Sequence, residues 1–292
     1  YHIWQRLAVF GYLAAVALSV AVMLFGREIN GSKRWLALGP FSFQPSEFAK
    51  VALILFLADL VTKNVKTIGK MWTLCRIMFW ILPIVGLVGA SNLSTAIIIL
   101  GIGVILIFVA SPKYAQFALM GIAGACFMGI FLALESYRLE RLAIWRNPEK
   151  YEKGYQTLQG LYAIGSGGVF GVGIGNSVQK LGFVPEAQND MIFSIICEEL
   201  GLAGAGIIVF LFLLLIWRFF LIASGSRDLF GALIATGAMA HMMIQVILNI
   251  AVVTNTIPNT GITLPFISYG GTSVMFLLIE MGLVLSVSQV VD

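Results

Sequence analysis

The pattern of hydrophobic and polar positions along the chain predicts a membrane protein with several helices. Long apolar runs recur through the sequence and are separated by shorter polar segments. Several runs approach the roughly 20 residues that a helix needs to cross a hydrocarbon core of about 30 Å. We expect eight membrane helices, at residues 4–25, 46–61, 77–91, 93–110, 114–134, 191–217, 229–254 and 271–290. The third and fourth of these could also be one hairpin around Ser91 and Asn92.

Composition supports the same class of protein. Hydrophobic residues make up 59% of the chain and charged residues 11%, whereas a soluble domain has about 25% charged residues. We therefore expect an all-α polytopic membrane protein. The net charge of +4 suits anionic membrane lipids as partners, and no pattern typical of nucleic-acid binding is present. Only three cysteines occur, in or beside predicted helices, so a disulfide framework is not expected.

The distribution of Lys and Arg gives a weak indication of orientation. It favours a cytoplasmic location for segment 62–76, provided that the long segment 135–190 is left out of the count as a functional domain. Segment 135–190 would then be a large extracytoplasmic loop. Because the first residue is Tyr1 and no cleavable signal is recognisable, the chain is expected to begin part-way into the native protein.

The long segment contains an amphipathic part and a glycine-rich part. Residues 135–150 mix charged and apolar side chains, as in a helix that lies on a membrane surface. Residues 165–175 hold six glycines, which predicts turns with positive φ or backbone in close contact with another group. Neither a P-loop nor GxGxxG spacing is present. Two interpretations stay open, namely a flexible or re-entrant loop and a backbone surface that receives a sugar or a phosphate.

Four carboxylates, those of Glu186, Asp190, Glu198 and Glu199, stand at the start of the apolar run that follows the glycines, in a chain with only 14. If Trp217 marks the other interface, Asp190 lies about two helical turns beyond the hydrocarbon edge, at the level of lipid head groups. A carboxylate at the edge of a low-dielectric region has a raised pKa and is a stronger base. The alternative is an acid that caps the helix.

Three stretches, at 30–50, 154–201 and 258–273, resemble the SEDS family (shape, elongation, division and sporulation), which includes FtsW and RodA, and the chain is FtsW-like along nearly its whole length. The resemblance implies a SEDS-type helical bundle of ten helices, with two before Tyr1. It further implies a single membrane domain over 1–292, in which loop 135–190 faces outward from the bacterial cytoplasmic membrane.

The same resemblance implies an enzyme, a peptidoglycan glycosyltransferase that polymerises lipid II and works with a class B penicillin-binding protein. Division, elongation and sporulation members share these motifs. A lipid-linked sugar flippase and a structural scaffold are the alternatives from other classes. The absence of a clear internal repeat and the position of the acids at the membrane edge favour chemistry over transport.

Asp190 matches the catalytic acid of the family, in PEAQNDMIF, where members often have PEAHTDFIF. One carboxylate suffices as general base, because the pyrophosphate that departs is already a stable anion and needs no proton. The departures at Gln188, Asn189 and Met191 affect neighbouring contacts more than the chemistry. Glu186 and Lys180, in the same stretch, are candidate substrate-binding residues.

The stretch QPSEFAK supplies further candidates. Ser46 can cap a helix on which Glu47 and Lys50 share a face. They either form an ion pair that fixes the helix end or bind the pyrophosphate of the substrate. Arg34, beside Trp35, is an interfacial anchor or a phosphate clamp. No ligand cluster specifies a metal or other cofactor, although a divalent cation (Mg or Mn) is chemically plausible at a pyrophosphate.

Polar residues inside the predicted helices either have a functional role or, as is commoner, form hydrogen bonds between helices. His241, Gln245 and Asn249 recur at helical spacing, and Glu280 lies in the middle of the last helix. Counting at 1.5 Å per residue puts His241 and Glu280 within about one turn of the same depth in two consecutive antiparallel helices. We therefore predict that they form a pair. Lys50 is the competing partner for Glu280, although it should lie nearer the outer surface.

Overall fold

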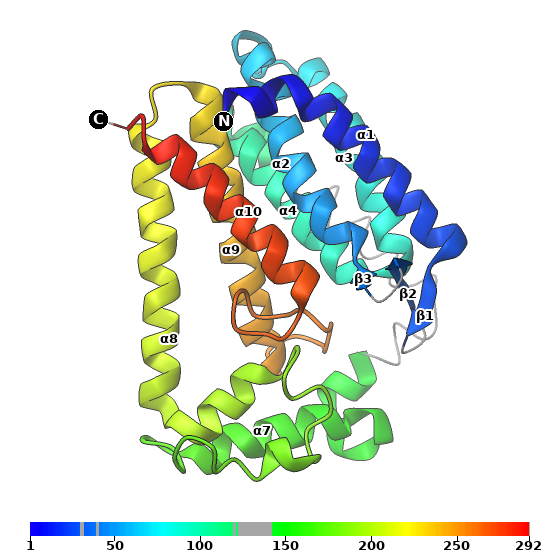
Figure 1. Ribbon diagram of the computed structural model, residues 1–292, viewed down its shortest axis with the longest axis vertical. Coiled ribbons are helices and arrows are strands. Elements are labelled where there is room, and N and C mark those ends of the chain that lie inside the picture. Colours follow the sequence, from blue (N-terminus) through cyan, green and yellow to red (C-terminus); the bar gives the residue numbers. More distant parts are fainter. Residues whose placement is uncertain (30–31, 39–40, 119–120, 122–141, 292) are drawn as a thin grey trace. The chain divides into compact units, whose positions relative to one another are not determined.

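The structure is a computed structural model that describes residues 1–29, 32–38, 41–118, 121 and 142–291, and it is mostly helical (Figure 1). The main elements are α1 (His2–Phe25), β1 (Arg27–Ile29), β2 (Ser32–Leu38), β3 (Phe41–Phe43), α2 (Pro45–Asn64), α3 (Met71–Ser91), α4 (Leu93–Ala110), α7 (Tyr155–Gly167), α8 (Ile192–Gly225), α9 (Leu229–Val253) and α10 (Gly271–Ser288). Single 3-10 turns occur at Val65–Thr67, Pro148–Lys150, Glu152–Gly154 and Gln179–Leu181.

The chain divides into two compact units. The first comprises Tyr1–Tyr114, Leu215–Ile244 and Gly270–Asp292, and the second comprises Ala115–Leu214 and Gln245–Tyr269. Each unit is discontinuous in sequence, so both are completed by segments far apart in the chain. A single membrane domain over 1–292 stays a prediction.

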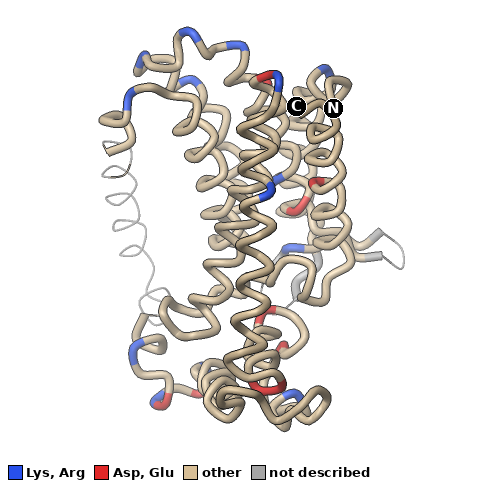
Figure 2. Tube along the Cα trace, turned by 90° about the vertical axis from the view of Figure 1, so that its left-hand side faces the viewer, with Lys and Arg blue, Asp and Glu red and all other residues tan. Residues whose placement is uncertain are grey.

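Six of the described helices are long and apolar enough to cross a membrane, which confirms a multi-pass membrane protein. They are α1, α3, α4, α8, α9 and α10, and each lies where an apolar run predicts a span. The run at 46–61 also forms a helix, α2, but its charged residues keep it out of this set. The run at 114–134 lies largely outside the described residues. Figure 2 shows that most of the helical trace carries no charge and that Lys, Arg, Asp and Glu lie largely at turns and helix ends.

The expectation of a purely α-helical chain is wrong in one place. Strands β1, β2 and β3 form a small antiparallel sheet between α1 and α2, in which Arg27 pairs with Trp35 and Leu36 with Phe43. The predicted Ser46 cap is also wrong. Helix α2 begins at Pro45, whose fixed φ and missing N–H suit the first helical position, and its N-cap Gln44 makes no side-chain cap hydrogen bond.

Small residues let the helices of the first unit approach closely. A Cβ added at Gly103 would lie 2.8 Å from Cδ1 of Ile81, and one added at Gly237 would lie 2.6 Å from Cγ2 of Ile54. In lipid, where no hydrophobic force drives helix association, such close packing supplies much of the attraction. Glycine at these crossings therefore fixes α3 against α4 and α2 against α9.

The segment predicted as a long loop is substantially structured in its described part. Residues 142–146 are helical, two 3-10 turns follow, and α7 occupies Tyr155–Gly167. The expected outward orientation of this segment stays a prediction. Of the amphipathic part predicted at 135–150, the structure describes residues 142–150.

The glycine-rich part lies against an interruption in α8. Gly201, inside α8, has φ 67° and ψ −170°, so the helix is broken there. Leu202 N donates to Gly168 O (2.9 Å) and Ala203 N to Val169 O (3.0 Å), while Val172 N donates back to Glu198 O (3.0 Å). The chain of residues 168–173 thus satisfies backbone groups that the break leaves without helical partners. A Cβ at Gly171 would lie 2.1 Å from Glu199 O, so both predicted reasons for glycine, positive φ and close approach, are confirmed here.

Candidate functional site

Asp190 is a buried carboxylate that lies two residues before α8. Only 8% of the residue is exposed, and its Oδ1 accepts a hydrogen bond of 3.4 Å from Nε2 of Gln156 on α7. Burial raises the pKa of Asp190 to about 6; backbone hydrogen bonds and the Gln156 bond oppose the rise, and the negative charge of Glu186 adds to it. Such a group is largely ionised at neutral pH and is more basic than an ordinary aspartate.

The segment after α9 holds Asp190 and its partner in place. Asn259 Nδ2 donates to Oε1 of Gln156 (3.0 Å), which orients the amide so that its Nε2 faces Asp190. Asn249 Nδ2 donates to the backbone O of Asp190 (2.9 Å) and to that of Ile262 (2.6 Å). A Cβ at Gly261, which has φ +66°, would lie 3.6 Å from Oδ2 of Asp190, so this backbone passes close to the carboxylate.

The same segment also fixes the residues just before Asp190. Ser268 Oγ donates to Asn189 O (2.7 Å), and Tyr269 N donates to Gln188 O (2.8 Å). Phe266 has φ 62°, a conformation that is costly for a bulky residue and persists only where the surroundings enforce it. The strain therefore lies in the turn that presents Ser268 and Tyr269 to the backbone before Asp190.

Glu186 and Lys180, the other predicted site residues of the second unit, are placed differently from each other. Glu186 is exposed, has φ 55°, and accepts a hydrogen bond from Asn189 Nδ2. Its charge reaches Asp190. Lys180 Nζ instead binds Oε1 of Glu199 (2.6 Å) and the backbone O of Gly175 (2.7 Å). Lys180 therefore ties the glycine-rich part to α8.

The first unit contains two buried pairs of ionisable side chains. Lys50 Nζ lies 2.9 Å from Oε1 of Glu47, with both side chains almost fully buried. Glu47 also accepts a hydrogen bond from Ser273. His241 Nδ1 lies 2.8 Å from Oε2 of Glu280, again with both partners buried, which confirms the predicted pair. These contacts join α2 to α10 and α9 to α10 within the bundle.

The other two polar residues singled out on α9, Gln245 and Asn249, make hydrogen bonds, but the partners of these bonds lie in the segments before α8 and after α9 and not on another helix. Gln245 Nε2 donates to Thr263 O (3.1 Å) and Thr263 Oγ1 (3.2 Å), and Asn249 supports Asp190 as described above. Along α9, His241 therefore bonds to another helix, whereas Gln245 and Asn249 bond to the segments that surround Asp190.

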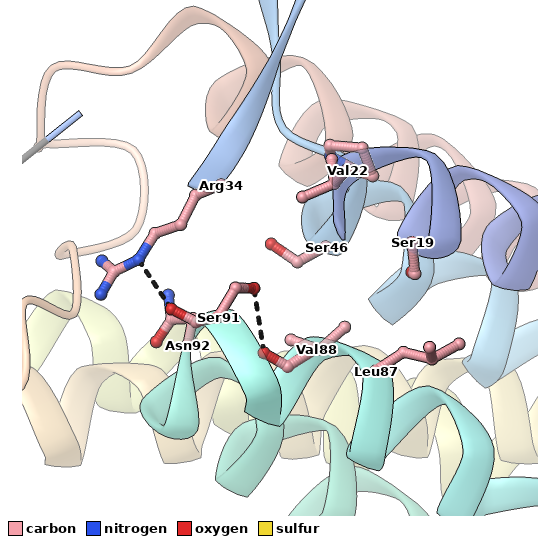
Figure 3. Close-up of a pocket in the computed structure, with 9 residues that line it drawn as sticks. Ser19, Val22, Arg34, Ser46, Leu87, Val88, Ser91 and Asn92 are labelled. Carbon is pink, nitrogen blue, oxygen red and sulfur yellow. Dashed lines mark hydrogen bonds between the residues drawn. The ribbon is translucent and has the colours of Figure 1, made fainter. Parts of the chain in front are cut away.

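Arg34 reaches from β2 to a small cavity of about 20 Å³ with a mixed polar and apolar lining, enough for about one water molecule. Its Nε donates to Ser91 O (3.2 Å) at the end of α3, and Figure 3 shows the guanidinium beside Ser91 and Asn92. The cavity lining also includes Ser19 and Ser46. Arg34 therefore bridges the sheet and a helix end.

The predicted site residues fall into two groups, since Asp190, Glu186 and Lys180 belong to the second unit and Arg34, Glu47 and Lys50 to the first. Sequence reasoning missed Gln156 and Asn259. Both lie in stretches that resemble the family, so those stretches were the available signal. Among the described residues, no group of three or more His, Cys, Asp and Glu side chains could hold a metal ion.

The fold and site define a multi-pass helical membrane protein with a buried, basic carboxylate just before a membrane helix. The chain belongs to the FtsW, RodA and SpoVE family of cell cycle proteins, whose model matches residues 1–292.

Named proteins of bacteria are similar to this chain over most of its length. Stage V sporulation protein E of Bacillus subtilis is 42% identical over 275 residues, covering 90% of this chain and 73% of that protein. A probable peptidoglycan glycosyltransferase FtsW of Coxiella burnetii is 37% identical, covering 98% of this chain and 79% of that protein.

Solved structures agree with the fold. A chain of a peptidoglycan synthase complex that coordinates polymerization and crosslinking superposes with a TM-score of 0.83 at 29% identity, covering 99% of this chain and 82% of that one. The rod shape determining protein RodA of Thermus thermophilus gives a TM-score of 0.70 at 30% identity, covering 98% of this chain and 78% of that one.

Proposed function

We propose that Asp190 is the general base of a glycosyl transfer that polymerises lipid II into glycan strands. The chain is a peptidoglycan glycosyltransferase, as the names of its relatives indicate. The observation that carries the role of Asp190 is a buried carboxylate with a raised pKa whose hydrogen-bond partner is a neutral amide.

In the proposed step, Asp190 takes the proton of an attacking sugar hydroxyl. The hydroxyl oxygen forms a bond to the anomeric carbon of the second sugar, and the bond between that carbon and the pyrophosphate oxygen breaks. The pyrophosphate leaves as an anion, so no second carboxyl group is needed to protonate it. Attack opposite the leaving group inverts the anomeric configuration.

Developing charge on the pyrophosphate needs balancing cations. We assign this role to Lys50 and Arg34, with Glu47 orienting Lys50 and with Glu186 and Lys180 contacting the substrate. Lys50 is 1% exposed and bound to Glu47, which equally supports a packing role. A divalent cation, Mg or Mn, would supply the same positive charge. We propose testing it by adding the cation to the polymerisation assay.

The proposal places the reaction on the extracytoplasmic side of the bacterial cytoplasmic membrane. It also includes a class B penicillin-binding protein as partner. Support comes from a structural neighbour that belongs to a peptidoglycan synthase complex coordinating polymerization and crosslinking. A transferase in such a complex would hand its glycan product directly to the crosslinking enzyme.

The decisive experiment measures glycan polymer made from purified lipid II by the full chain with its partner transpeptidase. Asp190→Asn keeps size and hydrogen bonding but removes basicity, and polymerisation should fall by about 100-fold or more. Glu152→Gln is the matched control, because Glu152 is an exposed acid of the same unit, and it should retain activity. Near-normal polymerisation by a folded Asp190→Asn protein would reject the assignment, and lipid II transport without polymer would favour the flippase.

A further inference from the structure

The glycine-rich segment presents an unusual number of exposed apolar side chains. Within residues 168–183 the only charged residue is Lys180, and it is held by Glu199. Phe170 is 84% exposed and Ile174 81%. The exposed apolar side chains are those of Val169, Phe170, Val172, Ile174, Val178, Leu181 and Phe183. A patch of this kind on a protein surface marks contact with lipid or with another protein.

Backbone bonds fix the first part of this segment against the membrane helix α8. Gly168 O and Val169 O accept from the amides of Leu202 and Ala203, directly after the break at Gly201. Leu202 is itself 71% exposed, and the exposed apolar side chains of Ile207 and Phe210 continue along α8. The exposed side chains of Val169 and Phe170 are therefore continuous with the surface that α8 presents to lipid.

The length of α8 places this region at the membrane border. The part of α8 after the break at Gly201, residues 202–225, extends about 36 Å, slightly more than a hydrocarbon core of about 30 Å. If Trp217 marks the far interface, Leu202 lies about 22 Å from it along the helix axis, which is still within the hydrocarbon. Residues 168 and 169, which are hydrogen-bonded to Leu202 and Ala203, then reach the same depth.

Several backbone groups of the segment are already bonded within the protein, which lowers the cost of such a position. Val172 N and Gly173 N donate to Glu198 O and Glu199 O, each at 3.0 Å. Asn176 Nδ2 donates to Val172 O (3.2 Å). If this segment enters the border region of the bilayer, these groups lose water but keep their hydrogen bonds within the protein.

We propose that residues 169–174, led by Phe170 and Ile174, insert into the lipid at the membrane border beside α8. The occupant of this surface is lipid acyl chain, because the surface continues the lipid-facing side of a membrane helix and carries no unpaired charge. The glycine-rich segment is thus a membrane-seated element that anchors the start of α8 next to Asp190.

Site-directed spin labelling of the full chain in lipid nanodiscs tests this assignment. Labels are attached to Phe170→Cys or Ile174→Cys after Cys75, Cys126 and Cys197 have been replaced. Ile207→Cys, on the exposed face of α8, is the lipid reference, and Glu149→Cys, at an exposed acid, is the water reference. The measured quantity is the ratio of collision rates with oxygen and with a water-soluble nickel chelate. Thermal unfolding of each labelled protein confirms that the variants fold.

At 170 and 174 the ratio should approach that at 207 and exceed that at 149 severalfold. A ratio equal to that at 149 would overturn the proposal. It would equally be overturned if both positions were water-accessible in nanodiscs and became protected only on addition of the transpeptidase, since the surface would then be a protein docking site. The readout does not involve enzymatic activity, so failure of the proposed mechanism leaves it unaffected.

Discussion

Replacing Gln156 by leucine should move the acid limb of the pH–rate profile without abolishing catalysis. Gln156 donates to the Asp190 carboxylate, and this bond lowers the pKa of Asp190 against the larger upward effect of burial. Hydrogen bonds to charged groups contribute about 1.5–3 kcal/mol. At 3.4 Å the bond is long, so we take about 1.5 kcal/mol, which corresponds to about one pKa unit.

The sign follows from which form is active. Asp190 acts as a base when ionised, and its pKa of about 6 means that activity is lost as the pH falls through that value. In Gln156→Leu the pKa rises to about 7, so the ionised fraction at pH 6 falls from about one half to about one tenth, a loss of about fivefold. Above about pH 8.5 both proteins are almost fully ionised, and their rates should converge.

The assay is the pH dependence of kcat/KM for lipid II polymerisation, which reports the pKa of the free enzyme. Gln159→Leu is the control, since Gln159 lies on the same helix α7 and makes no hydrogen bond with Asp190 in the described part of the chain. Asn259→Ala should shift the limb in the same direction by less, because Asn259 acts through Gln156. An acid limb that stays in place in Gln156→Leu, whatever happens to the plateau, would refute this account of Asp190.

Three further outcomes follow from buried groups. Lys50→Met should lower the melting temperature in detergent as well as activity, because loss of one partner of a buried ion pair costs about 3–5 kcal/mol, and Glu47→Gln/Lys50→Met should recover stability; recovery of activity as well would argue against a substrate role. His241→Leu should destabilise the protein by a similar amount and Glu280→Gln should partly rescue it, which a double-mutant cycle of unfolding free energies measures. Gly201→Ala should destabilise by at least about 1–3 kcal/mol, since its Cβ would lie 2.4 Å from Gly171 N, whereas Gly206→Ala in the same helix, with no atom within 4 Å, should be neutral or stabilising.

Hydrophobic patterning predicted the membrane helices well because a membrane span needs a long apolar run and little else. It missed all three strands. Strands β1 and β3 have three residues each and are too short for alternation to be recognised, and the seven residues of β2 were not recognised as a strand either. The break in α8 was also missed. A glycine within an apolar run is tolerated in a helix, and only its contact with residues 168–171 shows why Gly201 departs from helical geometry.

The site was predictable where a local rule applied. His241 and Glu280 are 39 residues apart, but two consecutive antiparallel helices allow depth to be counted from the chain ends. Asn259 and Gln156 are 103 residues apart, and no periodicity connects them. Their contact depends on the tertiary path of the segment after α9, which sequence spacing does not determine.

The buried acids of the described chain differ in what stabilises their charge, and this difference singles out Asp190. Glu47 and Glu280 each have a cationic or protonatable partner within 3 Å, in Lys50 and His241. Glu198 has no such partner but accepts bonds from Ser177 Oγ and from the amide of Val178.

Asp190 receives one long side-chain bond from a neutral amide and feels a second negative charge from Glu186. An acid that only had to be tolerated at a membrane edge would be stabilised by a cation, as Glu47 and Glu280 are, or by close hydroxyl and amide donors, as Glu198 is, since an unpaired buried carboxylate is costly. A cation, however, would lower the pKa and weaken the base. The arrangement at Asp190 keeps the carboxylate in place through Asn249 and the segment 259–269. Within the described part of the chain it receives hydrogen bonds from neutral groups and no ion pair with a cation, so its charge is available to take a proton.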